Sequence, residues 1–303
     1  MHGLSRLSPA RDSPLPVLRQ AQLHRDCRRL ARLAVRSLYQ ELTLYPKPGL
    51  VSLTDNGSHL DMNAGTFMRS LFALRHYFYR IARAGSRAAP FAELQQLGVQ
   101  AESRMLVATG GVNTHRGAIF ALGMLCAAIG YCRGQHIGLS PAALRAALLM
   151  RWGDALARHT LPHAATRSHG LQVASTHAVG GAREEGALGF ASVFEVALPR
   201  LEATLAQGRG EYEARVDALF ALMARLSDTN VYHRGGAAGA ALVRQRSAAF
   251  LAAGGTAHAD WHATALACHR EFVRHRLSPG GAADLLAAAC LVRQACAMDA
   301  VDR

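Results

Sequence analysis

Apolar residues recur at helical spacing along most of the chain, and this periodicity constrains the fold more than any other feature. Alternating strand patterns are nearly absent, so we expect an all-α protein. A length of 303 residues would permit two domains, but no repeat or low-complexity linker divides the interior, and we predict one large helical domain over residues 17–303. The predicted helices are Leu18–Leu44, Thr66–Ala84, Phe91–Val107, Ala118–Cys132, Ala142–His159, Glu184–Ala206, Tyr212–Leu226, Ala237–Ala253, Trp261–Arg276 and Ala282–Met298.

The N-terminal residues, the longest apolar run and the cysteines together indicate a cytoplasmic protein. Residues 1–16 contain three prolines and no apolar core, so we expect a disordered leader and no secretory signal. The nearest candidate for a membrane span, Ala118 to Tyr131, would cover only about 21 Å of a ~30 Å bilayer core. None of the six cysteines forms a C-x-x-C pair, which favours buried thiols in a reducing compartment.

The net charge of +13 indicates an anionic partner. The arginines are spread along the whole chain, and aromatic residues make up only 6% of it, too few for an evident base-stacking platform. A small polyphosphate substrate therefore explains the charge better than nucleic acid does, and we expect no nucleic-acid partner.

One lysine stands among 34 basic residues, and it lies in a Pro-Lys-Pro-Gly loop. Because an ammonium and a guanidinium are not interchangeable, we expect Lys47 to be present for its chemistry, as a phosphate ligand on a stiff loop. The alternative is an ordinary turn with an exposed lysine. Glu41 faces the same loop and is a candidate base. His59 and Asp61 follow as metal ligands or as an acid–base pair, although Asp61 also suits a helix cap.

Asn113, Thr114, His115 and Arg116 follow two glycines and precede an apolar helix. Free backbone N–H groups at a helix N-terminus favour an anion, so these residues predict a phosphate site, with a capped turn as the alternative. The segment is not a Walker A loop, because the Gly-Lys-Ser/Thr ending is missing.

Three further segments share this character. Arg183 and Glu185 at a helix start could bind phosphate and metal, although acidic residues are common in a first turn. The segment from Asp228 through Asn230 to Arg234, with Gly235-Gly236, echoes the Asn113 segment. The final segment is a Ser-Pro-Gly-Gly turn at residues 278–281, which we interpret as a connection between two helices. Asp284, just after it, is the residue of this segment that could have a functional role.

Together these segments resemble the triphosphoribosyl-dephospho-coenzyme A synthase family. The motifs run in order from about Glu41 to Leu286: Pro46-Lys47-Pro48-Gly49-Leu50-Val51, Gly57-Ser58-His59 with Asp61-Met62, Ala108-Thr109-Gly110-Gly111-Val112-Asn113-Thr114-His115, Gly181-Ala182-Arg183 with Glu185, Asp228-Thr229-Asn230 with Arg234-Gly235-Gly236, and Ser278-Pro279-Gly280-Gly281 with Ala283-Asp284-Leu285-Leu286. Ser52, Arg116 and Glu184 depart from the citrate-lyase branch. The form around Ser52 and Asn56 is more similar to the malonate-decarboxylase branch.

The resemblance implies that ATP and 3′-dephospho-coenzyme A are condensed, adenine is released, and a separate transferase loads the product onto an acyl-carrier subunit. We expect Mg²⁺ with the ATP. The rivals are the same reaction for citrate lyase, a metal-dependent hydrolase of nucleotide N-glycosidic bonds, and a non-catalytic nucleic-acid binder. The expected roles are catalysis by His59, His115 or Glu41, phosphate binding by Lys47, Asn113, Thr114, Arg116, Arg183, Asn230 and Arg234, and metal binding by one or two of Asp61, Glu185, Asp228 and Asp284.

Overall fold

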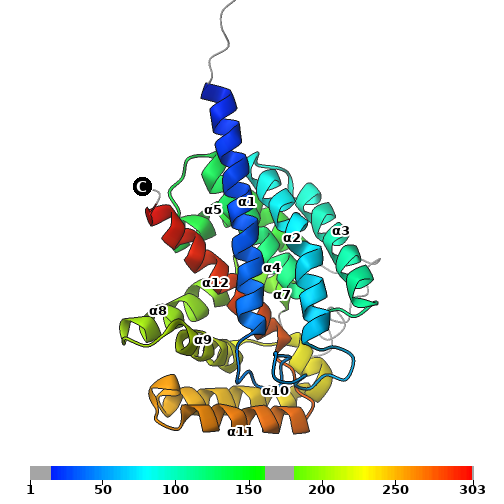
Figure 1. Cartoon of the computed structure of the whole chain (residues 1–303), viewed down its shortest axis with the longest axis vertical. Coiled ribbons are helices and arrows are strands. Elements are labelled where there is room, and N and C mark those ends of the chain that lie inside the picture. The colour runs from blue at the N-terminus through cyan, green and yellow to red at the C-terminus, as the bar shows by residue number, and fades with distance from the viewer. Residues whose placement is uncertain (1–14, 161–180, 302–303) are drawn as a thin grey trace, which may run out of the picture.

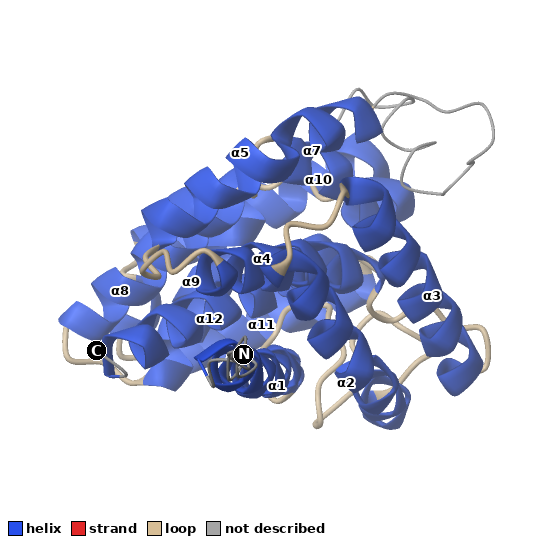
Figure 2. Ribbon diagram, turned by 90° about the horizontal axis from the view of Figure 1, so that it is seen from above, coloured by secondary structure: helices blue, strands red, loops and turns tan. Residues whose placement is uncertain are grey.

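A computed structural model describes residues 15–160 and 181–301, and within them the chain forms eleven α-helices and no strand (Figures 1 and 2). The all-α prediction is confirmed for this part of the chain. The predicted leader falls outside the described residues except for its last two, which begin the first helix. The elements are α1 Leu15–Leu42, α2 Ala64–Ser86, α3 Phe91–Thr109, α4 Arg116–Gly134, α5 Pro141–His159, α7 Ala182–Ala187, the π-helical turn η1 Ser192–Ala197, α8 Leu198–Ala206, α9 Glu211–Arg225, α10 Thr229–Ala252, the 3-10 turn η2 Gly255–Ala257, α11 Trp261–Arg274 and α12 Gly280–Val301.

Helix α4 forms the centre of the core, with α2, α3, α5 and α12 packed around it (Figure 1). Its closest neighbour is α2, because small residues let the two backbones meet: a Cβ atom on Gly130 would lie 2.2 Å from the Ala82 carbonyl oxygen. Tyr77 of α2 donates a hydrogen bond to the Ile119 carbonyl at 2.8 Å. This packing fixes the N-terminal end of α4, where the predicted phosphate loop lies.

Two helices of the described chain, Arg116–Gly134 and the segment Gly280–Asp299 of α12, are long and apolar enough to cross a membrane. The first is longer than the sequence pattern indicated. Burial within the fold accounts for their composition, since 72% and 67% of the respective windows are covered by the rest of the protein. They are core helices of this bundle.

Two helix predictions are wrong in extent. The segment predicted as one helix from Glu184 to Ala206 is interrupted, because Gly189 and Phe190 both take positive φ between α7 and the π-helical turn. Helix α10 begins at Thr229, eight residues before the predicted start at Ala237, and its glycine lies at an internal kink, where Gly236 has φ 58° and ψ −157°. Gly235 and Gly236 were expected to precede a helix, but they lie within α10, and Gly236 marks its bend.

The N-termini of α4, α10 and α12 meet the loop of residues 43–63 at one end of the bundle (Figure 1). Long-range contacts hold that loop in place. A Cβ on Gly49, which has φ 71°, would lie 2.1 Å from the Leu277 carbonyl oxygen, so only glycine fits there. Ser58 donates to the same carbonyl at 2.6 Å.

Candidate active site

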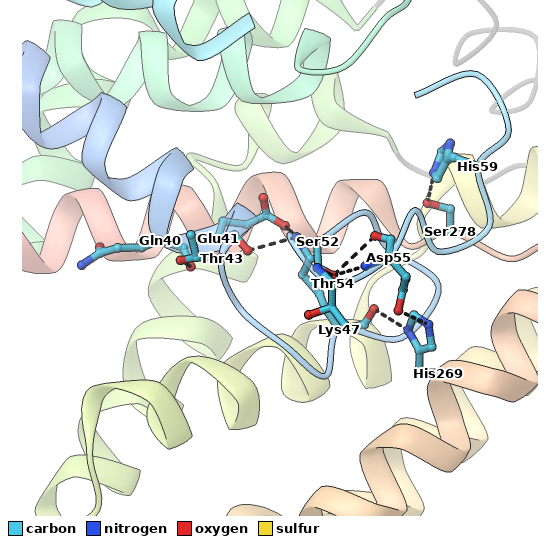
Figure 3. A network of polar contacts seen from close by, with 10 residues as sticks. All are labelled: Gln40, Glu41, Thr43, Lys47, Ser52, Thr54, Asp55, His59, His269 and Ser278. Carbon is cyan, nitrogen blue, oxygen red and sulfur yellow. Dashed lines mark hydrogen bonds and ion pairs between the residues drawn. The ribbon is translucent and has the colours of Figure 1, made fainter. Parts of the chain in front are cut away.

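Lys47 is buried inside the protein, with 1% of its surface exposed. Its ammonium donates to the Glu41 backbone carbonyl at 3.0 Å and to the Glu41 carboxylate at 2.6 Å (Figure 3). Burial lowers the pKa of Lys47, and the Glu41 carboxylate opposes that shift. An ammonium has three N–H donors, so within residues 15–160 and 181–301 one remains beyond the two that Glu41 takes.

His269 of α11 anchors the backbone of the same loop. Its Nδ1 lies 3.2 Å from the Lys47 carbonyl oxygen, and its Nε2 lies 3.2 Å from the Asp55 carboxylate (Figure 3). Asp55 also accepts from the Gly57 backbone N–H at 2.8 Å. The position of Lys47 is thus set by α11 as well as by the prolines beside it.

His115 lies at the N-terminus of α4 with 2% of its surface exposed. Its Nδ1 is 2.6 Å from the hydroxyl of Ser70 on α2, and its ring packs edge-to-face on Phe67 at 4.9 Å between centroids. Burial, and next the charge of Lys47, lower the pKa of His115 to about 3. In the described part of the chain, His115 Nε2 and Thr114 Oγ1 are buried atoms without a hydrogen-bond partner.

The other two residues of this segment lie at the surface. Asn113 accepts a hydrogen bond from the Arg116 backbone N–H at 3.1 Å, so the first N–H group of α4 is already occupied. The Arg116 guanidinium pairs with Glu102 of α3, with Nε 2.6 Å from the carboxylate. Arg116 must leave Glu102, or share it, to reach a phosphate near His115.

Two carboxylates close the site from the C-terminal part of the chain. Asp228 is buried and accepts from the backbone N–H groups of Asn230 at 2.9 Å and Ala282 at 3.1 Å, so it caps α10 and α12 together. Burial raises its pKa against the effect of those N–H groups. Both Asp228 oxygens are engaged in holding the two helix ends.

Asp284 of α12 reaches the start of α4, where the Ala118 backbone N–H favours its charged form. A Cβ on Gly117 would lie 2.2 Å from its Oδ2, so the glycine makes room for the carboxyl group. Burial, followed by the nearby charges of Glu41 and Asp228, raises the pKa of Asp284 well above its usual range. Glu41 and Asp228 therefore both lie within electrostatic reach of Asp284.

His59, Asp61 and Arg234 form a second group, beside the α11–α12 turn. Arg234 donates to His59 Nδ1 at 3.1 Å, so His59 Nε2–H donates to the Ser278 hydroxyl at 2.8 Å (Figure 3). Burial, and next the Arg234 charge, lower the pKa of His59 to about 4, while Asp61 opposes the shift from 3.6 Å. Both ring nitrogens of His59 are therefore occupied.

The remaining predicted residues are less central. Asn230 is exposed, with its amide nitrogen 3.1 Å from a Cβ placed on Gly280. Glu185 accepts from the Ser192 hydroxyl at 2.6 Å and from its backbone N–H at 3.2 Å, a contact that steadies η1. Arg183 donates to the His159 carbonyl at 3.2 Å.

The structure thus gathers Glu41, Lys47, His115, Asp228 and Asp284 from four distant segments. Sequence reasoning missed Ser70 and the Glu102 partner of Arg116. Ser70 left a signal, because it occupies a core position of α2, one turn before Leu74, where an apolar residue is expected.

Within residues 15–160 and 181–301, no group of three or more His, Cys, Asp or Glu side chains is arranged to hold a metal ion. Magnesium needs only one or two carboxylates when phosphates and waters complete its shell. Asp284 suits that requirement, because its carboxyl group is crowded by other acids and a cation there would relieve their repulsion. Glu185 suits it less, since both its oxygens are engaged by Ser192.

The fold and the site define a helical enzyme whose acid–base groups and spare donors surround the N-terminus of a core helix, a setting for an anionic substrate. The chain belongs to the ATP:dephospho-CoA triphosphoribosyl transferase family (CitG), whose model matches residues 27–301. It is therefore a ribosyl transferase.

Curated relatives cover nearly the same length. A probable 2-(5″-triphosphoribosyl)-3′-dephosphocoenzyme-A synthase of Pseudomonas fluorescens is 42% identical over 296 residues, which is 96% of this chain and 97% of the relative. A 2-(5″-triphosphoribosyl)-3′-dephosphocoenzyme-A synthase of Klebsiella pneumoniae is 41% identical, covering 86% and 91%. A probable synthase of the same name from Acinetobacter calcoaceticus is 40% identical, covering 85% and 88%. No solved structure matches the chain.

Proposed function

We propose that this enzyme condenses ATP with 3′-dephospho-CoA and releases adenine, forming 2′-(5″-triphosphoribosyl)-3′-dephospho-CoA. The family, and the names of relatives that match over most of their length, support this reaction. The observation that carries it is the spare Lys47 donor and the unpartnered His115 nitrogen beside the start of α4, which together form a site for a phosphate chain.

The reaction breaks the bond between adenine and C1′ of the ATP ribose and forms a bond from C1′ to the 2′-oxygen of dephospho-CoA. The attacking hydroxyl loses a proton and the departing adenine gains one, so protons balance. Lys47, Thr114 and the α4 N-terminus hold the triphosphate in this proposal, with Arg116, Arg183, Asn230 and Arg234 as further contacts around it.

The hydroxyl proton needs an acceptor close to Lys47. His59 is poorly suited, because Arg234 and Ser278 occupy its two nitrogens. Glu41 and His115 remain as the groups inside the buried cluster.

Mg²⁺ would shield the phosphate charge, and Asp284 is the carboxylate that we assign to it, with Asp61 outside the buried cluster. Asp228 positions the helix ends of α10 and α12 through its two hydrogen bonds. This division follows from which carboxylate oxygens the backbone already uses.

We place the enzyme in the cytoplasm and in the malonate-decarboxylase branch. The six thiols are all unpaired, as expected in a reducing compartment. The loop with Ser52 and Asn56 supports the branch. Incubating the product with its carrier-loading transferase and with the apo-carrier of malonate decarboxylase or of citrate lyase tests the assignment, and preferential loading of the citrate-lyase carrier would overturn it.

The decisive assay of the reaction combines purified enzyme, ATP, Mg²⁺ and dephospho-CoA and follows free adenine together with product mass. Adenine that appears only with both substrates, beside the condensed product, is the expected result. Adenine released without dephospho-CoA would instead identify a hydrolase of the N-glycosidic bond.

A further inference from the structure

The Ser70–His115 hydrogen bond fixes which nitrogen of the imidazole carries its proton. Ser70 Oγ lies 2.6 Å from His115 Nδ1, and Ser70 is completely buried. Two arrangements share this geometry. Either the hydroxyl donates to Nδ1 and the ring proton is on Nε2, or Nδ1–H donates to the hydroxyl and Nε2 keeps a lone pair.

The hydroxyl proton decides between them. Buried serines on helices often donate to the carbonyl four residues earlier, as Ser37 does to Leu33 at 2.9 Å. Among the described residues, Ser70 Oγ has no partner other than His115 Nδ1. Each arrangement leaves one buried donor without an acceptor in the described part of the protein, Nε2–H in the first and the Ser70 hydroxyl in the second. A bound ligand beside Lys47 can accept from Nε2–H, whereas none can reach the Ser70 hydroxyl, which is fully enclosed by the fold. The hydroxyl therefore donates, and the ring carries its proton on Nε2.

The Nε2–H group of His115 then lacks an acceptor. Its nitrogen is buried without a partner in the described chain, Phe67 holds the ring, and Lys47 is close enough for its charge to act on the imidazole. Lys47 is a donor too, with one N–H beyond the two that Glu41 takes in the described chain. A site made of converging donors calls for an acceptor with several oxygens.

We propose that Ser70 is a positioning residue that locks His115 in the Nε2–H tautomer, so that His115 donates a hydrogen bond to a phosphate oxygen of ATP and does not act as a base. The phosphate contact rests on the proposed function, whereas the tautomer does not. The lowered pKa of His115 keeps the ring neutral at physiological pH, so it stays a single donor. Glu41 is then the acceptor for the hydroxyl proton.

The tautomer is tested by ¹⁵N NMR of the full chain labelled at histidine, without substrate. Loss of resonances in His115→Gln identifies the ring. Wild type is expected to show a protonated Nε2 and an unprotonated Nδ1. Ser70→Ala should give a mixture of tautomers. The control Ser247→Ala removes an equally buried serine hydroxyl that has no hydrogen-bond partner in the described chain, and it should leave the spectrum unchanged. A protonated Nδ1 in wild type would overturn the proposal.

The donor role is tested by ATP affinity and turnover. The amide nitrogen of glutamine reaches about the position of Nε2 and can donate but cannot take up a proton. We therefore expect His115→Gln to keep ATP affinity and turnover within about tenfold of wild type, while His115→Ala binds ATP about tenfold more weakly. A base at this position would lose ~10²–10⁴-fold in turnover as glutamine, with ATP affinity intact, and that outcome would refute the donor role.

Thermal unfolding of each variant shows whether the fold survives. Adenine release by wild type decides the proposed function separately, since the tautomer is read without substrate. A wild-type enzyme that fails to bind ATP would remove the phosphate contact, whatever the tautomer.

Discussion

Gly117→Ala is the sharpest test of the contact between α4 and α12. A Cβ at this position would lie 2.2 Å from Asp284 Oδ2, about 1 Å closer than any ordinary contact. The atom in the way is the end of a short side chain, so the carboxyl group can swing aside while the backbone stays in place. That movement takes Asp284 away from the Ala118 N–H and displaces it from the site.

The two consequences differ in size. Moving the carboxylate away from the Ala118 N–H costs at most ~1 kcal/mol of folding free energy, and replacing glycine by alanine in a helix returns up to ~1 kcal/mol. Global stability should therefore change by no more than about 1 kcal/mol. A displacement of about 1 Å at a reacting group can cost ~10²-fold in rate, so turnover should fall by that order.

The assay pairs urea unfolding with the rate of adenine release. Gly153→Ala in α5 is the matched control, because its Cβ would meet only Leu149 at 3.7 and 3.8 Å. It should gain about 0.5–1 kcal/mol of stability and keep full activity. Wild-type turnover in Gly117→Ala would refute the placement of Asp284 in the reaction.

Three further predictions concern charge. Lys47→Met should destabilise the fold by ~3–5 kcal/mol, because it leaves Glu41 buried and unpaired. Adding Glu41→Gln should restore stability against urea without restoring activity. A Lys47→Met protein as stable as wild type would contradict the pairing. The unfolding free energy should fall as the pH is lowered from 6.5 to about 4, because His59 binds a proton in this range in the unfolded chain but stays neutral in the folded one. His59→Asn should therefore show a shallower decline of stability over the same range. Equal slopes for the two proteins would count against His59 as the origin. Chelation by EDTA should stop adenine release until Mg²⁺ is added, and Asp284→Asn should need more Mg²⁺ for half-maximal rate; an unchanged requirement would remove Asp284 as a ligand.

Helix positions were largely predictable because each core-facing stripe is a local pattern. The predicted Phe91–Val107, Ala142–His159 and Tyr212–Leu226 differ from α3, α5 and α9 by at most two residues at either end. The errors have a common origin. Gly189 and Phe190 break a periodic pattern through backbone dihedrals, and α10 continues past a kink at Gly236, which periodicity cannot register.

The candidate site was predictable as a set of unusual residues, but its arrangement was not. Lys47 was singled out by its rarity, yet its complete burial against Glu41 depends on α11 and α12 holding the loop. Ser70 was overlooked because its importance depends on a partner 45 residues away.

By itself, the sequence determined the all-α class, the core stripes and the residues with chemistry to offer, because periodicity, turn chemistry and residue type are local properties. The tertiary structure alone decided which carboxylate oxygens are free, which ring nitrogen of His115 is unpartnered and which arginines are already paired. Those properties depend on burial and on hydrogen bonds between distant segments, and neither exists until the helices have packed.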